Sequence, residues 1–220
     1  MLDEFFQFKY TLTSETGDLE SNRYINKYFV EIYTLPDDPD AAVLVGKAHF
    51  SIALISSASD DGFDFFELFD NNDSLLELGE TIFDFSTNDF HDTVSEYFRD
   101  SIGEDILLLK AIEILPDFRG RGLGKQLIKD IYIRFRHSCS MVALKAFPMQ
   151  CEGCENGADY EYENDWQRKM GYGNMNRDLE KNSYKLYAYY QKLGFQNFLR
   201  DEYFFLRPGL KNDKMDAVKF

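Results

Sequence analysis

Near the middle of the chain, an apolar strand runs into a glycine-rich turn and then into a helix, and this junction constrains the fold more than any other feature. Residues 106–115 are almost continuously apolar, as expected of a buried central strand. From Gly122 onward apolar residues recur at helical spacing, and residues 141–146 predict a further short strand. A strand–helix–strand unit has a right-handed crossover, which makes its two strands parallel. The sequence therefore predicts an α/β fold with a parallel strand pair at its centre.

The N-terminal part predicts strands of a different kind. Residues 4–13, 24–35 and 44–55 are rich in aromatic and β-branched side chains and are bounded by turn-forming residues. Their short connections favour an antiparallel meander. Residues 73–83 and 89–102 have helical spacing and begin with aspartates that can cap a helix. We expect all of these segments to belong to one domain, residues 1–220, with a mixed sheet.

The C-terminal part predicts an irregular insertion followed by a second helix. Residues 147–176 contain a proline, several glycines and a short candidate helix at residues 162–170. Residues 179–193 carry one apolar stripe of a helix that Gly194 ends. Residues 195–199 and 203–206 predict a final hairpin, and the chain from residue 208 onward predicts a frayed tail.

The net charge of −15 argues against a general nucleic-acid partner, because 39 acidic residues against 24 basic ones repel a phosphate backbone. The charge is unevenly distributed: residues 60–105 hold 15 acidic residues and one base, whereas residues 119–136 hold six bases and one acid. No apolar run reaches the roughly 18 residues of a spanning helix. The N-terminal residues are acidic where a secretory signal is basic. We therefore expect a cytoplasmic protein with no membrane partner.

The three cysteines do not suggest a secreted disulfide framework, because their number is odd. Cys151 and Cys154 have the spacing of a metal-ligand pair, and His137 with Cys139 would complete four ligands. A second pair at the usual spacing is absent. We predict a loop with free thiols and no metal site, with a structural zinc ion as the alternative.

The glycine-rich turn has the composition of an anion-binding site. Unpaired N–H groups at the start of a helix and the helix dipole attract negative groups, and glycines let a phosphate approach the backbone. The turn has neither the GK[ST] of a P-loop nor the surroundings of a dinucleotide-binding G-x-G-x-x-G motif. It comprises Arg119, Gly120, Arg121, Gly122, Leu123 and Gly124.

These six residues form the pattern R-x-x-G-x-G after a strand that ends in Leu115-Pro116, and this resembles the acetyl-CoA-binding motif of the GNAT superfamily of N-acyltransferases. A second segment, residues 190–195, has the sequence YQKLGF and resembles the Y-x-K-L-G-F element of the same family. The matched segments cover residues 106–146 and 182–206. The N-terminal half agrees only in its coarse order of strands and helices.

The resemblance implies a GNAT-like sheet with mainly antiparallel N-terminal strands and a central parallel pair that diverges to admit the pantetheine arm of acetyl-CoA. Backbone groups around Ile112 and Ile114 would pair with the pantetheine amides, and the amides of residues 119–124 would hold the pyrophosphate. The side chains of Arg119, Arg121 and Lys125 are candidates for the pyrophosphate or the 3′-phosphate, with a solvated helix face as the alternative.

Direct acyl transfer needs a base for the attacking amine and an acid for the departing thiolate. Tyr190 matches the family tyrosine whose hydroxyl faces the CoA sulfur, with a core aromatic as the alternative. Glu113, on the strand beside the turn, is the candidate base, acting directly or through water; Glu104 and Asp105 are alternatives. Many family members carry an asparagine seven residues before the tyrosine, where this chain has Ser183, a candidate cofactor contact.

We therefore expect an acetyl-CoA-dependent N-acetyltransferase that acts on a primary amine of a cationic small molecule or peptide, attracted by the acidic residues 60–105. A non-catalytic acyl-CoA-binding module is the main alternative, and an enzyme that uses a longer acyl-CoA is another. The aromatic edge strand at residues 203–206 favours strand pairing between copies, which is compatible with a homodimer.

Overall fold

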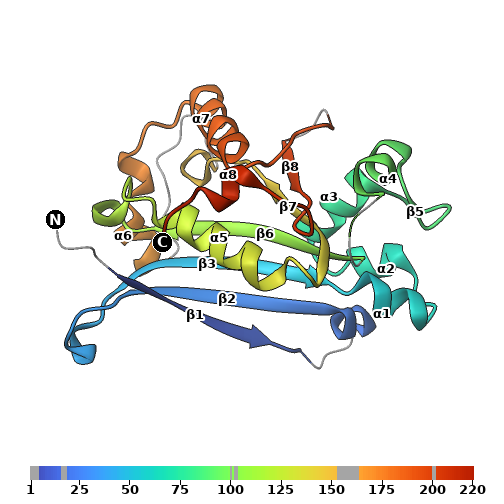
Figure 1. The fold of residues 1–220 in the computed structure, drawn as a ribbon, viewed down its shortest axis with the longest axis horizontal. Coiled ribbons are helices and arrows are strands. Elements are labelled where there is room, and N and C mark those ends of the chain that lie inside the picture. Colours follow the sequence, from blue (N-terminus) through green and yellow to red (C-terminus); the bar gives the residue numbers. More distant parts are fainter. Residues whose placement is uncertain (1–4, 16–18, 100, 102–103, 153–163, 200–201) are drawn as a thin grey trace.

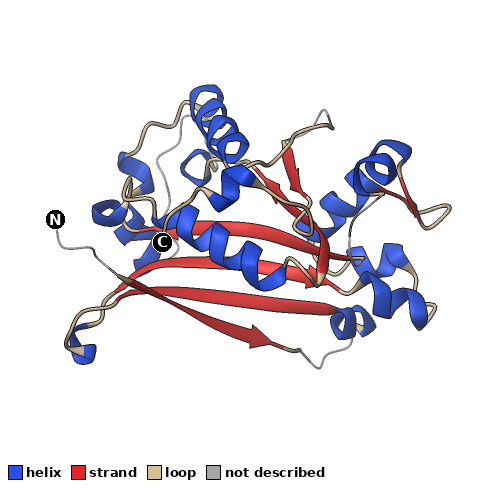
Figure 2. Cartoon of the chain, viewed as in Figure 1, coloured by secondary structure: helices blue, strands red, loops and turns tan. Residues whose placement is uncertain are grey.

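A six-stranded mixed sheet forms the centre of the molecule (Figures 1 and 2). The computed structural model describes residues 5–15, 19–99, 101, 104–152, 164–199 and 202–220. The strands are β1 (Phe6–Thr13), β2 (Ile25–Thr34), β3 (Leu44–Ala53), β6 (Asp105–Ile114), β7 (Cys139–Lys145) and β8 (Tyr203–Leu206), in the spatial order β1-β2-β3-β6-β7-β8. Of these pairs, β6–β7 is parallel and the others are antiparallel. The predicted α/β class and mixed sheet are confirmed.

Helices cover both faces of this sheet. On one face lie α5 (Leu123–Phe135), α7 (Leu179–Lys192) and α8 (Asp213–Asp216), packed on Leu107 and Leu109 of β6. The other face, at one end of the sheet, packs against α1 (Ile55–Asp60), α2 (Phe65–Phe69), α3 (Asp73–Ile82) and α4 (Asp92–Phe98) through Ile106 and Leu108. Successive side chains of a strand point to opposite faces, so β6 contributes to two separate cores.

Several short elements complete the chain. A two-stranded ladder joins β4 (Phe83–Asp84) to β5 (Asp89–Phe90), and α6 (Asp165–Met170) lies within the segment predicted as an insertion. Single 3₁₀ turns are η1 (Glu20–Tyr24), η2 (Pro39–Ala41), η3 (Pro116–Phe118), η4 (Met149–Cys151) and η6 (Tyr172–Asn174). Among the helices of the described ranges, none is long and apolar enough to cross a bilayer.

Three predictions about elements are wrong. The helix predicted at residues 89–102 begins only at Asp92, because Asp89 and Phe90 pair with β4. The final hairpin is reduced to a single bridge between Gln196 and Phe205. The predicted frayed tail instead contains α8, whose Met215 is fully buried. One apolar side chain in a polar segment was too weak a signal to predict that packing.

The two parallel strands separate halfway along β6. Their pairing runs from Asp105 to Leu109, opposite Leu144 of β7, and β7 ends one residue later. β6 continues to Ile114 against β3 alone, with a register shift at Lys110 that indicates a bulge. One edge of residues 110–114 is therefore not covered by β7.

Candidate functional site

A cavity of 420 Å³ lies at the uncovered edge of β6. Its lining residues come from β6, the segment after β7, the region of α6 and η6, and α7. Many are apolar or have a single polar atom, as in small-molecule sites. The members used below are Lys110, Ile112, Ile114, Arg119, Tyr172, Asn182 and Tyr190.

The backbone of β6 directs polar groups into this cavity. Leu115 donates its N–H to Val45 of β3, at 2.9 Å, so the backbone groups of residue 115 face β3. In an antiparallel ladder this direction alternates, and the N–H and C=O groups of Ile112 and Ile114 therefore point away from β3. The carbonyl of Ile114 accepts a hydrogen bond from Arg119 Nε at 2.7 Å. The peptide groups of Ile112 remain directed at the cavity.

The side chain of Arg119 holds the turn to the insertion. Besides the carbonyl of Ile114, its guanidinium donates to the carbonyl of Met170 at 2.8 Å and contacts Met175 Sδ at 3.2 Å. Burial lowers the pKa of this guanidinium from its ordinary value. Arg119 lines the cavity, but its donors are directed at protein carbonyls and sulfur, so its role as a phosphate contact stays a prediction.

The glycine turn presents backbone amides to its surroundings. Gly120 and Gly122 have φ angles of 76° and 86°, in the left-handed region, and a Cβ at either position would meet nothing within 4 Å. Gly122 is the N-cap of α5. Among the described residues, no acceptor bonds to the N–H groups of Gly120, Gly122, Leu123 or Gly124. These amides and the start of α5 are suited to an anion.

Arg121 and Lys125, the other two basic candidates, lie on the outer side of the turn. The Arg121 guanidinium lies 5.0 Å from the ring centroid of Phe118, and the Lys125 ammonium lies 6.0 Å from that of Tyr189. Neither is among the lining residues of the cavity at β6; both line a separate groove near the C-terminus.

Tyr190 is one of the residues that line the cavity at β6. It lies near the end of α7 and packs edge-on against Phe195, with ring centroids 5.8 Å apart. Within the described part of the chain, no side chain or backbone group hydrogen-bonds to its hydroxyl. Burial raises the pKa of Tyr190 to about 12. The phenol therefore remains protonated throughout the neutral range.

Tyr189, its neighbour, has a different position. Its hydroxyl lies 3.0 Å from where a Cβ on Gly124 would be, so the glycine allows α7 to approach the start of α5. Tyr189 is not among the lining residues of the cavity at β6. The structure thus distinguishes the two adjacent tyrosines, and Tyr190 is the one that faces the cavity.

Glu113 is nearly buried, 9 % exposed, and its carboxylate is held by the insertion. Tyr172 Oη donates to Oε1 at 2.9 Å, and Trp166 Nε1 donates to Oε2 at 3.2 Å. The Trp166 ring in turn lies over the ammonium of Lys47, 4.4 Å from the ring centroid. Tyr172 lines the cavity, whereas Glu113 does not. Among the described residues, the hydroxyl of Tyr172 links the Glu113 carboxylate to the cavity.

The other predicted polar contacts are placed elsewhere. Ser183 does not line the cavity; its neighbour Asn182 does, and Asn182 Nδ2 donates to the carbonyl of Asn176 at 2.7 Å. Glu104 and Asp105, the alternative bases, lie at the opposite end of β6 from Ile114. Asp105 accepts from the N–H of Ser56, and burial raises its pKa. Neither carboxylate belongs to the site at the uncovered edge.

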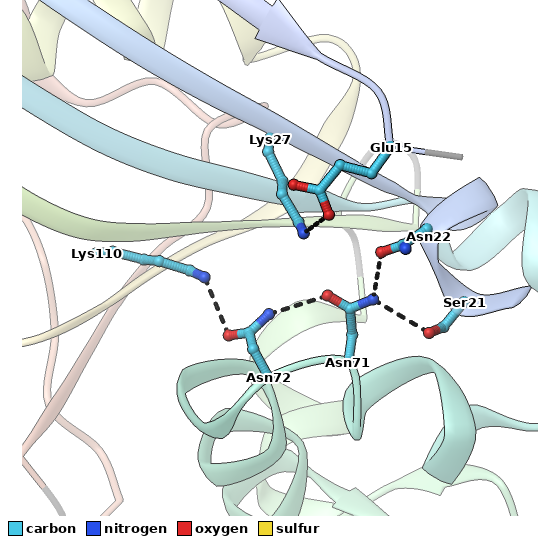
Figure 3. A network of polar contacts seen from close by, with 7 residues as sticks. All are labelled: Glu15, Ser21, Asn22, Lys27, Asn71, Asn72 and Lys110. Atoms are coloured by element: carbon cyan, nitrogen blue, oxygen red, sulfur yellow. Dashed lines mark hydrogen bonds and ion pairs between the residues drawn. The ribbon is translucent and has the colours of Figure 1, made fainter. Parts of the chain in front are cut away.

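A second cavity, of 880 Å³, adjoins the first. The two share lining residues where β6 and β7 separate, among them Leu109, Lys110 and Lys145. Lys110 donates to Asn72 Oδ1 at 3.0 Å, and burial lowers its pKa. Figure 3 shows how Asn72, through Asn71, extends this contact toward η1. Sequence reasoning missed Lys110 because a bulge position has no signature in the pattern of apolar residues.

The cysteines do not form one cluster. Cys139, at the start of β7, is buried, which raises its pKa to about 12. Cys151 is buried in η4, beyond the other end of β7, and Cys154 lies outside the described residues. Cys139 is the first residue of β7, whereas Cys151 lies six residues beyond the last residue of that strand. No group of three or more metal-ligating side chains occurs in the described ranges.

No protein-family model matches the sequence, and no curated protein matches it.

Proposed function

We propose that the protein binds acetyl-CoA at the uncovered edge of β6 and transfers the acetyl group to a primary amine. The observation that supports this most strongly is the coincidence of three features at one place. β6 and β7 separate after Leu109, the peptide groups of Ile112 point into the gap, and Tyr190 lines the same cavity. The GNAT resemblance of two sequence segments, residues 106–146 and 182–206, implies this arrangement.

The cofactor would lie along the edge of β6. A pantetheine arm carries two amides, which suit the N–H and C=O of Ile112 as a strand partner would. Its pyrophosphate suits the unpaired amides of the glycine turn that follows β6. The acetyl group then reaches the part of the cavity that Lys110 and Tyr190 line.

The transfer step needs one bond formed and one broken. The amine nitrogen attacks the thioester carbon, the carbon–sulfur bond breaks, and the thiolate takes a proton from Tyr190. A phenol of pKa about 12 is a weaker acid than an ordinary thiol, of pKa about 8.5. Proton transfer from Tyr190 to the departing thiolate is therefore uphill, and it is completed as Tyr190 regains a proton from solvent or takes the one released by the amine.

Glu113 would act as a positioning group or proton acceptor through Tyr172. A proton leaving the acceptor amine passes to Tyr172 Oη, which gives its own proton to Glu113 Oε1 over 2.9 Å. The acceptor itself would occupy the second cavity, since that cavity meets the first at Lys110. Within its lining, Glu77 forms an ion pair with Lys145, so attraction of a cationic acceptor would come from the acidic residues on α1–α4.

One observation favours a second candidate, a non-catalytic acyl-CoA-binding module. The Glu113 carboxylate has both oxygens bonded by protein donors and does not reach the cavity. A protein that retained the pocket for regulation would bind acetyl-CoA and release no thiol with any amine.

The experiment that tests transfer is thiol release from acetyl-CoA with a panel of primary amines. We expect Tyr190→Phe to lower kcat by about 100-fold with little change in acetyl-CoA affinity, because it removes only the proton donor. Tyr184→Phe is the matched control, since Tyr184 is on the same helix and 73 % exposed. Equal turnover of the two variants would contradict the acid role of Tyr190. Binding without turnover would favour the regulatory module.

A further inference from the structure

The two cavities at β6 meet at a small set of side chains that includes two lysines. The residues that line both cavities are Leu109, Lys110, Lys145, Phe147 and Met149. Among the described residues, no acidic side chain belongs to this shared set. An acceptor amine in the second cavity reaches the acetyl group in the first through this junction. The charges at the junction therefore decide which chemical groups fit beside the reacting amine.

The two lysines of the junction differ in their partners. Lys145 forms ion pairs with two carboxylates, that of Glu77 and, at 3.8 Å, that of Glu202. Lys110 forms no ion pair with any residue that the structure describes, and its ammonium donates to the neutral amide oxygen Oδ1 of Asn72 at 3.0 Å. An ammonium has three N–H donors. Two donors of Lys110 therefore have no acceptor within the described ranges.

The network behind Lys110 holds its ammonium without neutralising the charge. Asn72 Nδ2 donates to Asn71 Oδ1 at 3.1 Å. Asn71 Nδ2 donates in turn to Ser21 Oγ and Asn22 Oδ1 (Figure 3). Each of these groups is uncharged, so the network fixes the position of Asn72 and supplies no anion.

The nearest charge that affects Lys110 is a second positive one. Burial and the charge of Lys27 both lower the pKa of Lys110. Lys27 is paired with Glu15 Oε2 at 2.7 Å, so the carboxylate of Glu15 is directed at Lys27 (Figure 3). An anion beside an ammonium favours its charged form and opposes both effects. Lys110 is therefore a cation that an anionic ligand would stabilise.

We propose that Lys110 binds a carboxylate of the acceptor, so that the substrate is an amino acid or another primary amine with a carboxylate a few bonds away. The inference rests on the proposed function. Lys110 lies two residues before Ile112, a separation of roughly 7 Å along a strand. A carboxylate at Lys110 and an amine at the acetyl group are thus within the span of one small molecule.

The acceptor would then carry charges of both signs. The acidic residues 60–105 attract the ammonium of an amino acid as it approaches this side of the molecule. At the junction, Lys145 is already paired within the protein, and Lys110 receives the carboxylate. The carboxylate takes no part in bond making, so Lys110 determines specificity and carries no proton in the transfer.

Pairs of acceptors that differ in the carboxylate alone test the proposal. Glycine, leucine and lysine are each compared with their carboxamides, and kcat/KM is measured by thiol release at saturating acetyl-CoA. The selectivity is the ratio of kcat/KM for the acid to that for the amide. The two members of a pair differ in the basicity of the amine, but this difference is the same for every variant of the protein. Comparison between variants therefore isolates the contact with the carboxylate.

We expect the wild-type protein to prefer the acids, and Lys110→Gln to lower this selectivity by at least about tenfold, because a hydrogen bond between two charged groups is lost. The matched control is Lys27→Gln. It removes the same charge from a neighbouring lysine that lines neither cavity, and it should retain most of the wild-type selectivity.

The results distinguish this inference from the proposed function. Equal or higher kcat/KM for the amides in the wild-type protein, a selectivity that Lys110→Gln leaves unchanged, or an equal loss in Lys27→Gln overturns the carboxylate site. Each of these results leaves acetyl transfer to amines intact. Failure to transfer the acetyl group to either member of any pair overturns both.

Discussion

At the scale of single residues, the proposed site centres on Tyr190, whose hydroxyl has no hydrogen-bond partner among the residues that the structure describes. Tyr190 faces the cavity because it lies on the side of α7 that meets β6, whereas Tyr189, one residue earlier, meets Gly124. The sequence motif already indicated Tyr190. It did not indicate Asn182, Tyr172 or Lys110, because their positions depend on a helix rotation, the packing of the insertion and a bulge.

The raised pKa of Tyr190 has a measurable consequence for stability. Its folded-state pKa of about 12 exceeds the ordinary value of 10.0, so Tyr190 ionises more readily in the unfolded chain. Its contribution to the free energy of unfolding is fully present below pH 10 and is lost as the pH rises through 12. At pH 11 the folded state has lost about 1 kcal/mol of this stabilisation. We expect Tyr190→Phe to lose correspondingly less free energy of unfolding than the wild-type protein between pH 8 and pH 11.

Denaturant unfolding at the two pH values measures this difference, with Tyr184→Phe as the exposed control. An identical loss in wild type and Tyr190→Phe would show that burial does not disfavour the ionised phenol.

At the scale of elements, the sequence predicted those with long periodic patterns and missed those that depend on packing. The six strands of the main sheet and the helices α5 and α7 have such patterns, and all were placed within a few residues. α1 and α2 are six and five residues long, too short for a helical period to emerge. α8 is only four residues long and depends on Met215, whose burial requires the whole surface formed by α5 and α7.

The docking of α8 makes Gly194 a critical position. Its φ of 94° lies in the left-handed region, and a Cβ there would lie 2.5 Å from Asn212 Nδ2. We expect Gly194→Ala to lower the free energy of unfolding by about 2–4 kcal/mol, combining backbone strain with displacement of the Asn212 side chain that begins α8.

Gly62→Ala provides the control for this substitution. Gly62 also has a positive φ, of 68°, but a Cβ there would meet nothing within 4 Å. We expect Gly62→Ala to lower the free energy of unfolding by the backbone strain alone, about 1–2 kcal/mol. Equal destabilisation of the two variants in denaturant unfolding would contradict a close contact between Gly194 and α8.

At the scale of the whole molecule, charge and topology have separate roles. The acidic residues 60–105 lie largely on α1–α4, on one side of the sheet, and the basic residues gather around α5 and the C-terminus. The sequence showed the acidic group and the basic group. It did not show that Lys214 and Lys219 join the basic group, because this depends on the end of the chain folding back onto α5. The homodimer stays a prediction: β8 is an edge strand, but all four of its side chains are buried within the chain.

The central claim is that acetyl-CoA binds with its pyrophosphate at the glycine turn, and calorimetric titration of matched Gly120 variants tests it most directly. Gly120 has a φ of 76° and open space around it, a conformation that asparagine and aspartate tolerate better than other side chains. Gly120→Asn and Gly120→Asp therefore share shape and strain and differ in one negative charge. We predict micromolar binding by the wild-type protein and Gly120→Asn, and binding at least about tenfold weaker by Gly120→Asp. Equal binding by the two variants, or no binding by the wild-type protein, would contradict the claim.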